Sequence, residues 1–369
     1  MKTLSILTLT AVALVVPAGI WTTSAIQADD GPNHGNSVGH RMDGKRLFEE
    51  EEFGGNGRAC VTCHSTATGS VSPAEVQARF AQDPTDPLFR AKDSDDGTGS
   101  SYNRLLTWGI FRVTLPTHAN IVPADDPTAT EVDLFRGTGN TINTAPLDEF
   151  LMLDGREDNL EDQALGAVHA HYDNTEEPDA NDLERLAQFQ HTRQFFSSDE
   201  LYEFANNGGA APELPPGNTP AEIRGRRFFE PTGMCGKCHG GAMLNTQNNG
   251  SRFTTSLVTA PVMTVLPRPN PNRTWRVRNP QGIFVNRIAE DPGRILQTGV
   301  FNHFGQFRIP TLWNVKNTAP YFHNNSAADL DILLRHYQEF FTRPPVMPGP
   351  DGVLDNAEIE DVKAYLLLL

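Results

Sequence analysis

The sequence of 369 residues has few basic residues, few cysteines and few long hydrophobic runs. Lys and Arg number 30 against 46 Asp and Glu, and the formal net charge is −16. This charge disfavours nucleic acid and anionic lipid as partners, because both would be repelled. Beyond the N-terminus no run approaches transmembrane length, so we expect no membrane span after processing. By contrast, 31 Gly and 27 Pro predict many loops between short helices.

Residues 1–25 have the layout of a secretory signal peptide. Lys2 gives a positive start, an apolar run follows, and small residues then offer cleavage after Ala25 or Ala28. The alternative is an uncleaved anchor helix, which Pro17 makes a poor one. We therefore expect an exported, periplasmic protein.

The four cysteines fall into two identical Cys-x-x-Cys-His patterns. Two disulfides, or one zinc ion shared by both pairs, would leave the histidines unexplained. With 11 His in 369 residues, two such placements by chance have odds of about one in a thousand. The pattern is the attachment signature of c-type haem, in which the thiols add to the vinyl groups and the histidine ligates iron. The sequence therefore predicts two covalent haems, held by Cys60, Cys63, His64, Cys235, Cys238 and His239.

The chain repeats itself around these motifs. Gly44-Lys45-Arg46-Leu47-Phe48 precedes the first motif, and Gly225-Arg226-Arg227-Phe228-Phe229 precedes the second. Each segment reads as the end of a short amphipathic helix. Each half also closes with an expected helix, over residues 181–204 and after a capping box at residues 355–358.

The predicted fold class is therefore mainly α, with two tandem cytochrome c-like haem domains and long loops. The expected domains are residues 30–205 and 221–369, joined by a linker over residues 206–220 that is rich in Asn, Gly and Pro.

One loop contains an acidic run at residues 93–97. It lacks Gly and Glu at the positions that a helical-hand calcium loop requires, so a solvated acidic loop is the favoured interpretation.

Several further motifs resemble those of the bacterial dihaem cytochrome c peroxidase and MauG-like family. In the first half these are Leu153-Asp154-Gly155-Arg156 and Leu160-Glu161-Asp162-Gln163-Ala164. In the second half they are the stretch from Phe307 to Val315 and Thr318-Ala319-Pro320-Tyr321-Phe322-His323. The resemblance spans most of the processed chain, although residues 65–140 match poorly.

The resemblance implies roles for individual residues. His64 would be the proximal ligand of the peroxidatic haem, and His239 that of the electron-transfer haem. Glu161 would be the distal carboxyl group that moves a proton during peroxide cleavage. From the residues alone, the favoured interpretation of Glu161 is an acid in the N-terminal turn of a helix, where it would complement the dipole. The resemblance shifts the preference to the catalytic role. Thr318 and Pro320 match positions whose carbonyl oxygens help to bind calcium in the family.

The family's spacing also places Tyr337 as the sixth ligand of the second haem. Peroxidases have Met at this position and MauG-like members have Tyr. Met raises a haem potential, whereas an oxygen ligand stabilises oxidised iron. The alternative is that Tyr337 is a core aromatic residue and that His336 or Met347 ligates the iron.

The sequence departs from the family pattern in three respects. No histidine lies between His64 and Trp108, where peroxidases keep a displaceable ligand of the first haem. The expected distal Gln and Trp appear as Leu151 and Leu153, and an expected Arg as Trp313. The first haem is therefore expected to be open without prior reduction, in a less polar pocket.

The leading functional interpretation is a periplasmic oxidoreductase that reduces hydrogen peroxide at the first haem. Electrons would come through the second haem from a small redox protein. The alternatives are a MauG-like oxidation of a protein or organic substrate, and a plain dihaem electron carrier. A homodimer and one bound calcium ion are also left open.

Overall fold

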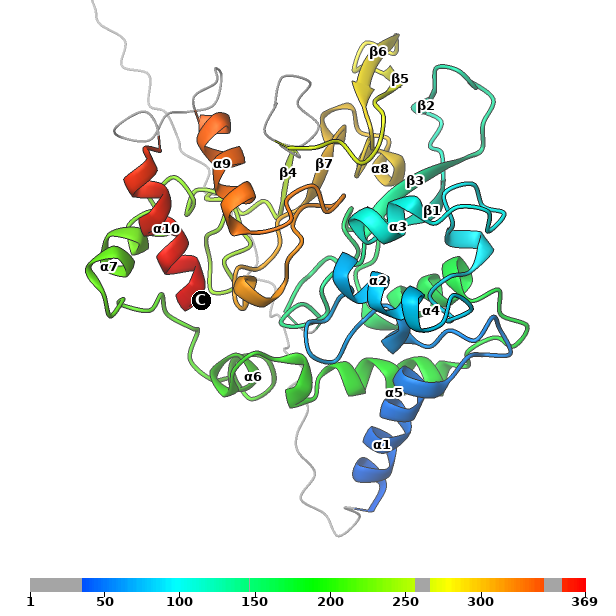
Figure 1. The fold of residues 1–369 in the computed structure, drawn as a ribbon, viewed down its shortest axis with the longest axis horizontal. Helices are drawn as coiled ribbons and strands as arrows, with labels where there is room; N and C mark the ends of the chain where they lie inside the picture. Colours follow the sequence, from blue (N-terminus) through cyan, green and yellow to red (C-terminus); the bar gives the residue numbers. More distant parts are fainter. Residues whose placement is uncertain (1–34, 146, 256–265, 342–353) are drawn as a thin grey trace, which may run out of the picture.

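A computed structural model describes residues 35–145, 147–255, 266–341 and 354–369 (Figure 1). The predicted signal peptide, with Ala25 and Ala28, lies outside these ranges, and so does Met347. Among the described residues, no helix has the length and apolar character needed to cross a membrane.

In each half, the helix before the Cys-x-x-Cys-His motif packs against a helix from the later part of that half (Figure 1). Helix α1 (Gly35–Glu50) packs on α5 (Ala180–Gln190), and α7 (Pro220–Arg226) packs on α10 (Asn356–Leu368). The repeat read from the sequence is therefore present as two equivalent helix pairs.

A glycine lies at each of these helix crossings. A Cβ atom added to Gly44 would lie 2.3 Å from the carbonyl oxygen of Arg185, and one added to Gly225 would lie 2.0 Å from that of Asp361. Real Cβ atoms do not approach an oxygen so closely, so only glycine allows the two helix backbones to touch. This explains why both repeats begin with Gly.

The helix expected over residues 181–204 is wrong as one element. Helix α5 ends at Gln190, a 3-10 turn η3 follows (Arg193–Phe195), and α6 (Asp199–Asn206) starts anew. The break occurs because the Ser198 side chain accepts a hydrogen bond from the amide of Leu201 (3.3 Å) and caps a second helix. The capping box predicted at the C-terminal helix is confirmed, since Asp355 and Glu358 each accept the other's amide hydrogen.

The remaining helical elements surround these pairs. Helix α4 (Leu160–His171) packs on α5, and α9 (Leu330–Phe341) packs on α10. The others are α2 (Pro73–Gln82), α3 (Asn103–Trp108), α8 (Ile295–Thr298), η1 (Cys60–Thr62), η2 (Ala91–Asp93), η5 (Phe301–His303) and η6 (Val315–Asn317).

The fold is not all-α, because the described residues form three small antiparallel sheets in addition to the helices. Strands β1 (Ile110–Pro116) and β3 (Glu131–Gly137) form one sheet. The other sheets consist of β2 (Ile121–Pro123), β5 (Arg273–Arg278) and β6 (Phe284–Ala289), and of β4 (Phe253–Thr255) with β7 (Gln306–Arg308). The expectation of a mainly α protein is therefore only partly correct.

The second sheet joins the two halves of the sequence. Strand β2 from the first half pairs with β5 from the second, with Ile121 opposite Val277. Ile121, Trp275 and Val277 are completely buried in a shared core. The tandem arrangement is thus not seen as two separate bodies, and the domain boundaries stay a prediction.

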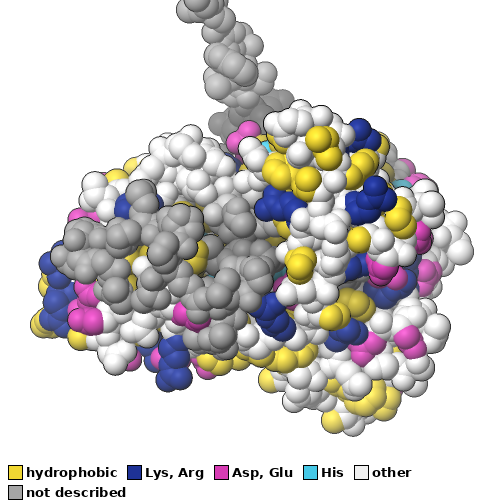
Figure 2. Space-filling view, turned by 90° about the horizontal axis from the view of Figure 1, so that it is seen from above, with side chains coloured by type: hydrophobic (Ala, Val, Ile, Leu, Met, Phe, Trp, Pro, Cys, Tyr) yellow, Lys and Arg dark blue, Asp and Glu magenta, His cyan; other side chains and the backbone are white. Residues whose placement is uncertain are grey.

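The hairpin of β5 and β6 is at the face seen in Figure 2, where basic and hydrophobic side chains lie side by side. The guanidinium groups of Arg276 and Arg278 stack on the Phe284 ring, 5.2 and 4.6 Å from its centre. Ile283 and Ile288 are exposed on the same hairpin. The negative charge of the chain is therefore not spread evenly over its surface.

Candidate functional site

The first Cys-x-x-Cys-His motif forms a tight turn at η1. The amide of His64 donates to the carbonyl of Cys60 (3.0 Å), and the His64 Nδ1 atom lies 3.0 Å from the carbonyl oxygen of Gly69. A carbonyl can only accept, so Nδ1 carries the hydrogen and Nε2 keeps its lone pair. Histidines that ligate metals are commonly fixed in this way.

The second motif repeats this geometry. The amide of His239 donates to the carbonyl of Cys235 (2.8 Å), and Nδ1 of His239 lies 2.8 Å from the carbonyl oxygen of Leu244. Burial lowers the pKa of His64 and of His239, which favours the neutral imidazole that metal binding requires. Both motifs therefore present an equivalent imidazole nitrogen.

None of the four cysteines forms a disulfide bond. Burial raises the pKa of Cys60 to about 11 and that of Cys235 to about 12. Neutral buried thiols are poor catalytic nucleophiles and poor zinc ligands. Within the described ranges, no three His, Cys, Asp or Glu side chains converge as a metal site would require. The disulfide and shared-zinc alternatives are therefore not supported.

Each motif lines its own cavity. Cys63 and His64 lie in the first cavity, and Cys235, Cys238 and His239 in the second. Thiols and an imidazole beside a mostly apolar hollow form the set of groups that a c-type haem requires, so the residues present fit this group.

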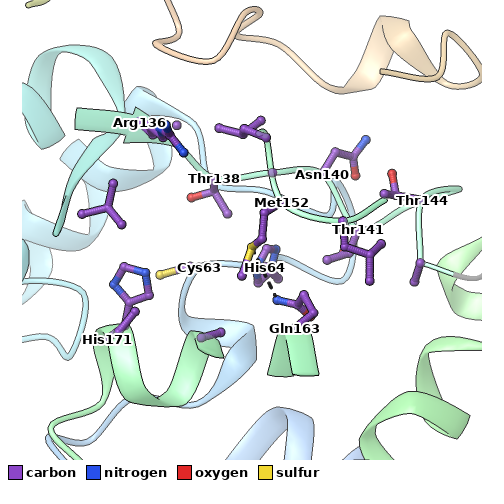
Figure 3. A pocket seen from close by; sticks show the side chains of 18 of the residues that line it. Cys63, His64, Arg136, Thr138, Asn140, Thr141, Thr144, Met152, Gln163 and His171 are labelled. Atoms are coloured by element: carbon purple, nitrogen blue, oxygen red, sulfur yellow. Dashed lines mark hydrogen bonds between the residues drawn. The ribbon is translucent and has the colours of Figure 1, made fainter. Parts of the chain in front are cut away.

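The two cavities share a wall. The segment Gly137–Asn140, which follows strand β3, lines both of them, as do Thr144, Leu153 and Arg308. Figure 3 shows Thr138 and Asn140 of this segment, together with Thr144 further along the chain, above His64. Two groups bound in these cavities would therefore be neighbours, separated by one layer of chain.

Buried charges surround the first cavity. Arg136 binds Asp291 (2.7 Å) and Asp154 (2.6 Å), and Arg156 binds Asp154 (2.9 Å). Burial alone would raise the pKa of Asp154, but the two guanidinium groups lower it to about 2. Arg136 and Arg156 both line the cavity, so the Asp-Gly-Arg motif serves to fix positive charge there.

Glu161 is not among the residues that line the first cavity, although it lies in the first turn of α4. The face of α4 that lines the cavity carries Leu160, Gln163 and His171. Glu161 occupies the N-terminal turn that a dipole-complementing role requires. Its acid–base role stays a prediction that the lining of the cavity does not support. Leu151 and Leu153 do line the cavity, as expected for a less polar pocket.

His171 is a cavity residue that the sequence reasoning missed. Its Nδ1 atom lies 3.0 Å from Oδ1 of Asp93, which also pairs with Arg58. The acidic run is therefore not simply solvated, because Asp93 and Ser94 are buried. No local pattern could reveal this contact, since 78 residues separate the two side chains.

In the second cavity, Tyr337 lies in the lining together with His239. Its neighbour His336 is completely buried and is not part of that lining. Tyr337 is therefore the better placed of these two candidate ligands. Thr318 and Pro320 also line this cavity, and their role in calcium binding stays a prediction.

Comparison with known proteins gives a family-model match within the first half. No curated protein sequence matches the chain. Among solved structures, a MauG-like protein associated with microbial copper homeostasis is 19% identical, with a TM-score of 0.49 and coverage of 89% of this chain and 87% of that one. The dihaem peroxidase BthA from Burkholderia thailandensis is 16% identical, with a TM-score of 0.44 and coverage of 89% and 85%.

The hydrazine synthase of Kuenenia stuttgartiensis is 14% identical, with a TM-score of 0.42 and full coverage of both chains. Likenesses of this size do not bear on activity. The family model described as di-haem cytochrome c peroxidase matches residues 43–203, which include the first haem motif, the Asp-Gly-Arg segment and α4. By this match the chain resembles the di-haem cytochrome c peroxidase and MauG-like family, whose members are dihaem oxidoreductases.

Proposed function

We propose that the chain is an exported dihaem c-type oxidoreductase that reduces hydrogen peroxide at the first site. Two electrons and two protons convert one peroxide molecule into two water molecules. The electrons would arrive at the second site from a small redox protein. Cys60 and Cys63 would attach one haem, Cys235 and Cys238 the other, and His64 and His239 would hold the two irons.

The observation that carries the proposal is the difference between two adjacent cavities. The first contains fixed polar groups, Arg136, Arg156 and Gln163, which suit a small polar substrate. The second places Tyr337 in the lining with His239, so both side chains could hold the iron of a haem bound there. This asymmetry favours chemistry at the first site and electron relay at the second.

When bound, the haem supplies the iron that holds the oxidant and exchanges electrons with it. The protein supplies charge and orientation. Arg136 is held by Asp154 and Asp291, so its guanidinium group is fixed before substrate arrives. Such preorganised positive charge stabilises an oxygen that becomes negative as the O–O bond breaks.

A second candidate function is a MauG-like oxidation of a protein or organic substrate. Tyr337 in the lining favours it, because an oxygen ligand would stabilise oxidised iron at the second site. This reaction would withdraw electrons from a large substrate instead of accepting them from a donor protein.

Absorption and EPR spectra of the purified oxidised protein test the proposal. We expect a five-coordinate, high-spin signal from one haem and a low-spin signal from the other. Intact mass should exceed that of the processed polypeptide by two haem groups. Two low-spin signals would instead indicate a plain electron carrier.

Two variants locate the reaction. His64→Ala should abolish reaction with peroxide, because it removes the iron ligand of the first site. His239→Ala should impair electron delivery while the first haem still reacts once. Reaction mainly at the haem held by His239 would reverse the assignment. Turnover of peroxide with a reduced donor, compared with oxidation of an organic reductant, separates the peroxidase from the MauG-like candidate.

A further inference from the structure

The loop between α2 and α3 places the carboxylate of Asp93 in the protein interior, next to the first cavity. Asp93 is 3% exposed and pairs with Arg58, which is 1% exposed. Arg58 is fixed in turn by the carbonyl groups of Pro87 and Leu88, each at 2.8 Å. Asp93 therefore has little freedom to move, and its second oxygen is held toward α4.

That second oxygen meets His171 in the last turn of α4. Oδ1 of Asp93 lies 3.0 Å from Nδ1 of His171, and Arg58 donates a further hydrogen bond to the carbonyl of His171 (3.3 Å). The same ion pair thus fixes both the ring and the backbone of this residue. A histidine held in this way keeps one orientation.

The orientation decides which ring nitrogen is available. The Asp93 carboxylate faces a guanidinium group and can only accept, so Nδ1 of His171 carries the hydrogen and Nε2 keeps its lone pair. No described residue hydrogen-bonds Nε2. The His171 side chain is 31% exposed and lines the cavity that contains Cys63 and His64, which Figure 3 shows beside it.

We propose that His171, oriented by Asp93, is the proton acceptor of the first cavity. The inference rests on the proposed function, in which this cavity binds hydrogen peroxide. As the oxidant binds through one oxygen, that oxygen loses its proton to Nε2 of His171, and the proton is later returned to the departing oxygen. The proton transfer to Nε2 itself moves no electrons, and the Asp93 carboxylate faces the imidazolium formed. When the O–O bond breaks, the departing oxygen leaves as water, and two electrons from the donor with two protons from solvent convert the other oxygen into the second water molecule.

Two further observations support this role. Burial, together with Arg58, Arg156 and Lys92, lowers the pKa of His171 to about 3, so the ring is neutral at pH 7. Glu161, the group that the sequence suggested for proton transfer, does not line the cavity.

The test uses two small ligands of the holoprotein instead of peroxide turnover. Hydrogen cyanide must lose a proton to bind ferric iron, whereas carbon monoxide binds ferrous iron without any proton transfer. His171→Gln keeps a polar side chain but removes the base. We expect it to slow cyanide association at the first haem by at least about 100-fold. Carbon monoxide association should be unchanged.

His169→Gln is the matched control, because His169 lies on the same helix but is 49% exposed and pairs with Glu177. It should leave both rates unchanged. Asp93→Asn is a second variant, useful if His171→Gln fails to incorporate haem. An amide can donate to Nδ1 and move the ring hydrogen to Nε2, so cyanide association should again be slow.

The outcomes separate the inference from the proposed function. If carbon monoxide binds normally and neither variant slows cyanide, His171 is not the acceptor, and the proposed function stands. The inference is also overturned if the first haem is low-spin and His171→Gln makes it high-spin, because His171 is then an iron ligand. If the first haem of the wild-type protein binds neither cyanide nor carbon monoxide, the inference about His171 and the proposed function are both wrong.

Discussion

At the scale of single residues, the buried charges near the first cavity lie in fixed pairs and clusters, as far as the structure describes the chain. Arg58 with Asp93, and Arg136 with two carboxylates, are almost completely buried. A buried pair contributes little net stability, but loss of one partner leaves an uncompensated charge. These clusters therefore act chiefly by holding side chains at the first cavity in place.

Asp93→Ala should lower the free energy of unfolding by about 3–5 kcal/mol, because it leaves Arg58 buried without its carboxylate. Urea unfolding followed by circular dichroism measures this change. Asp126→Ala removes an exposed carboxylate from another loop and should change the free energy of unfolding by less than about 0.5 kcal/mol. Equal effects of the two substitutions would show that the buried pair is not formed.

Because of Asp154, the free energy of unfolding should fall at acidic pH. Its pKa is about 2 in the folded protein, against 3.8 when unperturbed. A carboxyl group whose pKa is lower in the folded than in the unfolded protein stabilises the fold fully at pH values above its unfolded-state pKa. This stabilisation is lost as the pH falls through the folded-state pKa. Between about pH 5 and pH 2 the wild type should lose about 2 kcal/mol more than Asp154→Asn. Asp158→Asn, at an exposed position, should follow the wild type.

Some of the site could be predicted from sequence and some could not. The ligands His64 and His239 follow from motifs of five adjacent residues, because covalent attachment requires thiols and imidazole close together in the chain. His171 has no such signal, since its partner Asp93 reaches it only through the tertiary fold. Glu161 has a family position but lies on α4 outside the residues that line the cavity. Position in a motif therefore does not decide where a side chain points.

At the scale of elements, the helices before each haem motif were predictable, whereas their packing partners and the strands were missed. Strand β1 alternates buried and exposed side chains from Val113 to Pro116, and β3 does so from Glu131 to Arg136, which is the expected period of two. The strands were missed because the high glycine and proline content of the chain was interpreted as a sign of loops. The predicted helix over residues 181–204 failed because Ser198 starts a new helix by capping it, an outcome that hydrophobic spacing does not show.

The helix crossings give a prediction at this scale. Gly44→Ala and Gly225→Ala should each destabilise the protein by about 1–3 kcal/mol, because the new methyl group meets a backbone carbonyl. Gly166→Ala is the control, since it lies within α4 and its Cβ would meet only Glu157 at 3.5 Å. That substitution should stabilise by about 0.5–1 kcal/mol through helix propensity. Thermal unfolding of the three variants distinguishes these signs.

At the scale of the whole molecule, the two halves depend on one another. Ile121 of β2 is buried against Trp275 and Val277 of the second half. Residues 30–205 and 221–369, produced separately, should each fail to show a cooperative thermal transition. Co-expression of the two fragments should restore it, because the sheet and its core can then form. A cooperative transition in either fragment alone would establish an independent domain.

The wall shared by the two cavities has a thermodynamic consequence. Gly137–Asn140 contacts both sites, so a shift of this segment caused by binding at the first must alter the surroundings of the second. Such coupling is reciprocal. The free energy by which a ligand at the first site changes the reduction potential of the second equals the free energy by which reduction of the second changes that ligand's affinity. Through the segment Gly137–Asn140, substrate binding at the first site would then change the driving force for electron transfer from the second site, without a separate regulatory domain.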